Sequence, residues 1–230
     1  MDGETAPSSP VNHRTRPLTA KQERKLVENL EERFLDLMRN LKKRSDPSST
    51  LRTLSSYLQA AQPLLALILQ IPPLDPSTSL RTTFLLRLTN DVMHAIPGYA
   101  PDAATLPQLL AWLDVLDKGW LAVLRAQAWD PVAHEGVDLD LDLPEDADAP
   151  PRRSTPVNQT ERARLHSLLV MGTGAMEEWL EKLNTEGDDY EALERLGLQQ
   201  GFDQLFFRCL AEMGGLSEAA NDPSGMIGTC

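Results

Sequence analysis

Residues 106–128, LPQLLAWLDVLDKGWLAVLRAQA, carry the apolar pattern that decides the fold. Apolar residues recur three or four positions apart, which places them on one face of a helix: Leu109, Trp112, Leu113, Leu116, Trp120, Val123 and Leu124. The opposite face is charged, with Asp114, Asp117, Lys118 and Arg125. The spacing therefore predicts a helix over 106–128, in which Trp112 and Trp120 anchor a buried core.

The same periodicity predicts five further helices. They are expected at residues 20–43, 49–71, 76–96, 159–183 and 190–213. Thr19 with Gln22 and Asn158 with Glu161 have the spacing of capping boxes, and Asp75 before Pro76 is typical of an N-cap. Pro63 is expected to kink or divide the second helix, because proline removes a hydrogen-bond donor. Gly214 and Gly215 are expected to end the last helix.

These elements predict an all-α fold, roughly a six-helix bundle with a disordered N-terminal tail and an acidic, Pro-rich internal linker. The expected segments are a tail over 1–17, four helices over 18–129, the linker over 130–157, two helices over 158–215 and a flexible tail over 216–230. Two amphipathic helices cannot bury both of their apolar faces alone. We therefore expect the last pair to dock on the first four helices in one domain.

Composition limits the class of function. The chain has 230 residues and a formal net charge of −12, which argues against generic nucleic-acid binding. Its two cysteines, Cys209 and Cys230, form no disulfide framework and fit a reducing compartment. The longest apolar run is far shorter than the ~20 residues that span a bilayer. We expect a protein of the nucleus or cytoplasm that does not enter the membrane.

Motifs for catalysis are lacking. The chain contains no phosphate-binding loop, nucleophile elbow or zinc-ligand spacing, so we expect no enzyme activity, no cofactor and no metal. Glu177, Glu178 and Glu181 form an acidic helix face without the Glu-x-x-His pairs of a di-metal bundle. Gly172 and Gly174 are interpreted as a packing notch or kink rather than a dinucleotide motif.

Residues 137–148, VDLDLDLPEDAD, form an alternating and then acidic segment. Its apolar positions are Val137, Leu139, Leu141 and Leu143. An apolar alternation followed by an acidic cluster resembles SUMO-interacting motifs, and the resemblance implies a segment that adds a strand to a partner's sheet edge. The alternative is a solvated acidic loop whose leucines rest on the bundle.

The first helix is the basic end of an acidic chain. Residues 1–45 carry ten Lys or Arg against seven Asp or Glu. We expect Lys25, Arg33 and Arg39 to contact a protein partner through charge pairs. The alternatives are a solvated face or contact with nucleic acid through residues 42–44.

The sequence RRSTP at 152–156 is a candidate modification site. Thr155 before Pro156 suits a proline-directed kinase, and phosphorylation of Ser154 or Thr155 is expected to tune partner binding near the N-terminus of the next helix. Together these features predict a non-enzymatic intracellular interaction protein, an adaptor or structural subunit of a larger complex, whose partner the sequence does not identify. The alternative is a regulator of chromatin or nucleic-acid machinery acting through the basic first helix.

Overall fold

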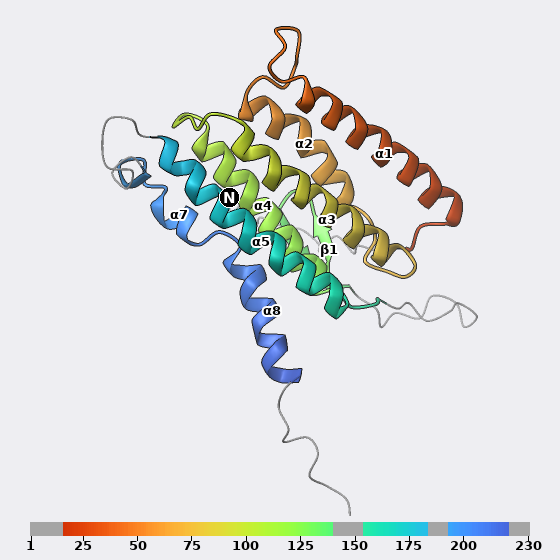
Figure 1. Ribbon diagram of the computed structural model, residues 1–230. Helices are drawn as coiled ribbons and strands as arrows, with labels where there is room; N and C mark the ends of the chain where they lie inside the picture. The colour runs from red at the N-terminus through yellow and green to blue at the C-terminus, as the bar shows by residue number, and fades with distance from the viewer. Residues whose placement is uncertain (1–15, 140–153, 184–192, 221–230) are drawn as a thin grey trace, which may run out of the picture.

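The computed structural model describes residues 16–139, 154–183 and 193–220. Its main elements are α1 (Ala20–Lys42), α2 (Leu54–Leu69), α3 (Ser77–Ala95), η1 (Ile96–Gly98), α4 (Leu106–Leu124), β1 (Ala128–Asp130), β2 (Glu135–Val137), α5 (Gln159–Leu180), η2 (Glu181–Leu183), α7 (Gln199–Asp203) and α8 (Phe207–Ala220). The long helices lie side by side in Figure 1, and the predicted all-α class is confirmed.

Two of the three predicted helix starts are confirmed. Thr19 and Asn158 each accept a hydrogen bond from the third helical backbone N–H, and Gln22 and Glu161 bond back to complete capping boxes. The expected cap at Asp75 is wrong. Pro76 occupies the N-cap position of α3 and has no side-chain group that could cap the helix, and the Asp75 carboxylate accepts hydrogen bonds from Thr155.

Helix α4 lies at the centre of the core. It packs against α2, α3, α8 and the two short strands. Trp120 is fully buried and donates from Nε1 to Thr89 Oγ1 at 2.9 Å, and Trp112 is 5% exposed, so both predicted anchors are confirmed. A Cβ on Gly119 would press on the side chain of Leu69, so this glycine lets α2 and α4 approach closely.

Two helices are continuous where the sequence contains a proline or two glycines, so Pro63 does not divide the second helix. Helix α2 continues through Pro63 from Leu54 to Leu69. Helix α5 continues through Gly172 and Gly174. A Cβ on Gly172 would collide with the side chain of Met93 in α3, so Gly172 is the packing notch that its sequence suggested.

A β-hairpin occupies the start of the predicted linker. Strands β1 and β2 pair antiparallel, with Ala128 opposite Val137 and Trp129 opposite Gly136. Trp129 is buried, and the space beside Gly136 is filled by Gln127 and Ala122. The predicted linker over 130–157 therefore begins within a hairpin, because residues 128–137 fold back on α4.

The predicted single helix over 190–213 is also wrong. Gly197 and Phe206 have positive φ angles of 66° and 57°, so the chain turns before α7 and again before α8. Helix α8 then continues through Gly214 and Gly215 to Ala220, where a stop was expected. Helix α5 packs on α3 and η1, and α8 packs on α4.

Candidate partner-binding pocket

The alternating segment is only partly described. Val137 lies in β2 and is 38% exposed, and Leu139 is half-buried. Leu141 and Leu143 lie outside the described residues. Within the described chain, β2 pairs with β1 along one of its edges. The addition of residues 137–143 as a strand to a partner's sheet stays a prediction.

The basic residues predicted to bind a partner lie on the outer face of α1. Lys25, Arg33 and Arg39 are exposed, and Arg39 contacts Asp36 at 3.5 Å. Arg44, just beyond the end of α1, contacts another part of the chain, because it donates to the carbonyl of Gly98 and lies over the ring of Tyr99. The α1 face therefore mixes both charge signs and forms no continuous basic patch.

The candidate phosphorylation site lies against α3. Thr155 Oγ1 donates to Asp75 Oδ2 at 2.6 Å, and the Thr155 N–H donates to Asp75 Oδ1 at 3.3 Å. Ser154 Oγ is buried and has no partner within the described part of the chain. A phosphate on Thr155 would replace a donor with negative charge beside Asp75, so modification would loosen this contact.

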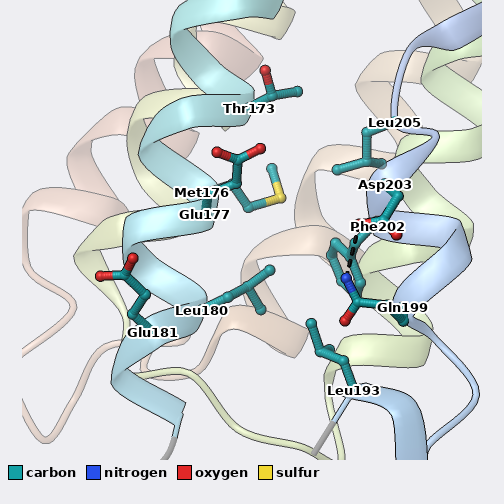
Figure 2. A pocket seen from close by; sticks show the side chains of 10 residues that line it. All are labelled: Thr173, Met176, Glu177, Leu180, Glu181, Leu193, Gln199, Phe202, Asp203 and Leu205. Carbon is teal, nitrogen blue, oxygen red and sulfur yellow. Dashed lines mark hydrogen bonds between the residues drawn. The ribbon is translucent and has the colours of Figure 1, made fainter. Parts of the chain in front are cut away.

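A small pocket opens between α5 and the turns around α7 (Figure 2). Its volume is about 260 Å³. Helix α5 contributes Thr173, Met176, Glu177 and Leu180, and η2 begins with Glu181. The facing wall consists of Leu193, Gln199, Phe202, Asp203 and Leu205.

The pocket exists because α7 is held on α4 rather than on α5. Gly201 approaches so closely that a Cβ would collide with Leu110 of α4. The positive φ angles at Gly197 and Phe206 reverse the chain on both sides of this contact. Sequence periodicity does not predict these two turns, because the apolar spacing over 190–213 fits one continuous helix equally well.

The charged groups that line the pocket are all carboxylates. Glu177, Glu181 and Asp203 are exposed carboxylates at its rim. The Gln199 amide donates from Nε2 to Asp203 Oδ1 at 2.8 Å, and its buried Oε1 has no partner among the described residues. Figure 2 shows this amide facing the pocket interior. The Thr173 hydroxyl donates to the carbonyls of Leu169 and Val170.

This arrangement suits a ligand that donates hydrogen bonds and carries positive charge. None of the residues lining the pocket is Lys, Arg or His. The floor is apolar, because Met176, Leu193 and Phe202 are buried. A pocket of this size is smaller than the roughly 300–1,000 Å³ of typical small-molecule sites, so it accommodates a side chain better than a cofactor.

A second, larger groove lies between α4 and the start of α8. Its volume is about 470 Å³. Its charged groups are already paired, since Arg208 Nη1 contacts Asp114 at 2.8 Å and Asp117 at 3.0 Å. Asp117 also accepts from the backbone N–H of Cys209. These contacts fasten α8 to α4 and leave no free charge in the groove to orient a ligand.

Cys209 does not form a reactive site. Burial, with the nearby Asp117 as a second cause, raises the pKa of its thiol far above the ordinary value of 9.0. The thiol also contacts the Asp117 carbonyl at 3.1 Å. Because the thiolate is the nucleophilic form, this cysteine is held in its unreactive state.

Searches for other kinds of site and for relatives gave no match. Across the described ranges, no three His, Cys, Asp or Glu side chains gather as a metal ion would require. In the same ranges, no helix is long and apolar enough to cross a membrane. No protein family, no curated protein and no solved structure matches the chain.

Proposed function

We propose that the protein is a non-enzymatic interaction protein, an adaptor or structural subunit of a larger complex. It binds a basic segment of a protein partner in the pocket between α5 and α7. The observation that carries the proposal is the combination of an apolar floor with a rim whose charged groups are all carboxylates. Such a site holds the stem of a Lys or Arg side chain while its charged end contacts the rim.

The ligand chemistry follows from the lining residues. An apolar stem packs on Met176 and Phe202, which removes apolar surface from water. The charged end donates to Glu177 or Glu181, and a second donor reaches the unpartnered Oε1 of Gln199. The pocket holds one anchor side chain, so neighbouring basic residues of the partner remain at the rim. Salt screens these outer contacts.

Selection of displayed peptides against the full-length protein tests this function. The selection identifies peptides that bind wild-type protein, and their affinities are then measured for the variant Glu177→Lys/Glu181→Lys. Both residues are exposed, so the substitutions preserve the helix. We expect selected peptides to contain Lys or Arg beside an apolar residue. Their affinity should fall by at least roughly tenfold in the variant, because like charges are then brought together.

The matched control is Glu178→Lys. Glu178 is exposed on the same helix but is not part of the pocket lining. This variant carries the same kind of charge reversal and should bind the selected peptides nearly as tightly as wild type. Acidic peptides, or peptides that bind the double variant with unchanged affinity, would contradict the proposed function.

A further inference from the structure

The exposed face of α5 is partly apolar. Met171 is 75% exposed and Val170 is 49% exposed, although both lie in the middle of a long helix. Helix α5 contacts α3 and η1 with its inner side. Arg164, Ser167, Met171, Gly174 and Glu178 follow one another at alternating steps of three and four, so they form one continuous seam.

The charges of this seam are self-complementary. Arg164 lies seven residues before Met171, and Glu178 lies seven residues after it. Seven residues are about two helical turns, or roughly 10 Å, so both charges share the face of Met171. A second helix rotated about a two-fold axis through Met171 would place its Glu178 opposite Arg164, and its Arg164 opposite Glu178.

This order of charges does not serve the helix itself. The helix dipole favours acidic residues near the N-terminus and basic residues near the C-terminus. In α5 the basic Arg164 lies in the first half, whereas Glu178 lies in the last turn, which has no basic residue. Glu178 in the last turn is therefore slightly unfavourable in the isolated helix, and a basic side chain from a second copy would offset that cost.

Gly174 fits the same arrangement. A glycine inside a helix is about 1 kcal/mol less favourable than alanine. A Cβ built on Gly174 would meet nothing within 4 Å, so no neighbour in this chain requires the glycine. Gly172 differs, because Met93 fills its space. The open space beside Gly174 has room for a helix of a second copy.

We propose that the protein forms an isologous dimer in which α5 pairs antiparallel with α5 of a second copy. Met171 lies at the two-fold axis, and Arg164 of each copy contacts Glu178 of the other. One helix crossing is smaller than the ~1,600 Å² of a standard stable interface, so the dimer dissociates on dilution. The pocket lies beside this seam, because Glu177 and Glu181 line it and come seven residues after Val170 and Gly174, so the two sites are tested with different variants.

Sedimentation analysis of the full-length protein over a concentration series tests the dimer. Wild-type protein should shift from monomer to dimer as its concentration rises. Arg164→Glu and Glu178→Arg should each raise the dissociation constant by roughly tenfold or more, because like charges then face each other. The double swap Arg164→Glu/Glu178→Arg should restore the wild-type constant. Lys25→Glu on α1 is the control, and it should leave the constant unchanged.

The results separate this proposal from the alternatives. A wild-type protein that stays monomeric into the millimolar range overturns the dimer. A dimer that survives both single swaps overturns the α5 interface, as does a double swap that fails to restore association. Peptide binding by the pocket is measured separately, and Glu178→Arg should leave it intact while it weakens the dimer.

Discussion

At the residue scale, Arg81 is a buried charge whose hydrogen bonding is incomplete among the described residues. It is 1% exposed and donates from Nη1 to the carbonyl of Gln127 at 2.7 Å. Its Nε and Nη2 have no hydrogen-bond partner in the described chain, and burial lowers the pKa of the guanidinium to about 10. Arg81 therefore connects α3 to the segment that enters the hairpin, but burial of its charge lowers the stability of the fold.

Replacing Arg81 by methionine should therefore stabilise the protein. The lowered pKa corresponds to about 3 kcal/mol of unfavourable burial. Loss of the hydrogen bond to the Gln127 carbonyl costs about 2 kcal/mol, which offsets part of that gain. We expect Arg81→Met to raise the free energy of unfolding by about 1 kcal/mol in a urea titration. Arg87→Met is the comparison: Arg87 contacts Glu31 and lies over Phe34, so its loss should not stabilise.

Asp114 should make the attachment of α8 sensitive to acid. Burial raises the pKa of Asp114, but hydrogen bonds from Lys118 and Arg208 outweigh it and hold the pKa below its ordinary value of 3.8. A lowered pKa in the folded state adds stability that is present above 3.8 and is lost as pH falls through the folded value. The effect is small, because the side chain is 40% exposed.

Thermal unfolding across a pH series measures this contribution. The melting temperature of wild type should fall more between neutral and strongly acidic pH than that of Asp114→Asn. Asp36→Asn on the exposed face of α1 is the control and should follow wild type. Equal acid sensitivity of wild type and Asp114→Asn would show that Arg208 does not hold α8 through this carboxylate.

At the element scale, the two glycines of α5 have opposite roles. Gly172 lies against Met93, so the Cβ of Gly172→Ala would collide with that side chain and should lower the free energy of unfolding. Gly174 faces open space, so Gly174→Ala should raise it by about 1 kcal/mol. Both variants are compared by urea unfolding at concentrations where the protein is monomeric. The same sign of effect at both positions would contradict the packing described for α5.

Local patterns in the sequence predict the elements that depend on neighbouring residues. The apolar spacing around Leu30, Phe34 and Leu37 gives the buried face of α1, and the capping boxes give two helix starts. The hairpin was missed because its strands are only three residues long and depend on burial of Trp129 rather than on a local sequence pattern.

The pocket lay beyond sequence reasoning for a similar reason. The acidic face of Glu177 and Glu181 is visible in the sequence, but the opposite wall is not. That wall depends on a positive φ at Phe206, which no local preference of phenylalanine predicts. It also depends on the contact of Gly201 with Leu110, residues that are far apart in the chain.

At the scale of the whole molecule, α5 contributes residues to two proposed interaction surfaces. One side lines the pocket, and the outer seam around Met171 is free to pair with a second copy. The net charge of −12 adds a long-range attraction for a basic partner. A dimer would present two pockets, so a partner with two basic segments would bind more tightly than either segment alone.

Hydrogen–deuterium exchange with and without a selected basic peptide tests the central claim most directly. The account predicts that the peptide slows amide exchange in the second half of α5 and in residues 199–205, which form the two walls of the pocket. Exchange in α1 should be unchanged, and the protection should disappear in Glu177→Lys/Glu181→Lys. Protection confined to α1, or protection of the pocket walls that persists in this variant, would contradict the account.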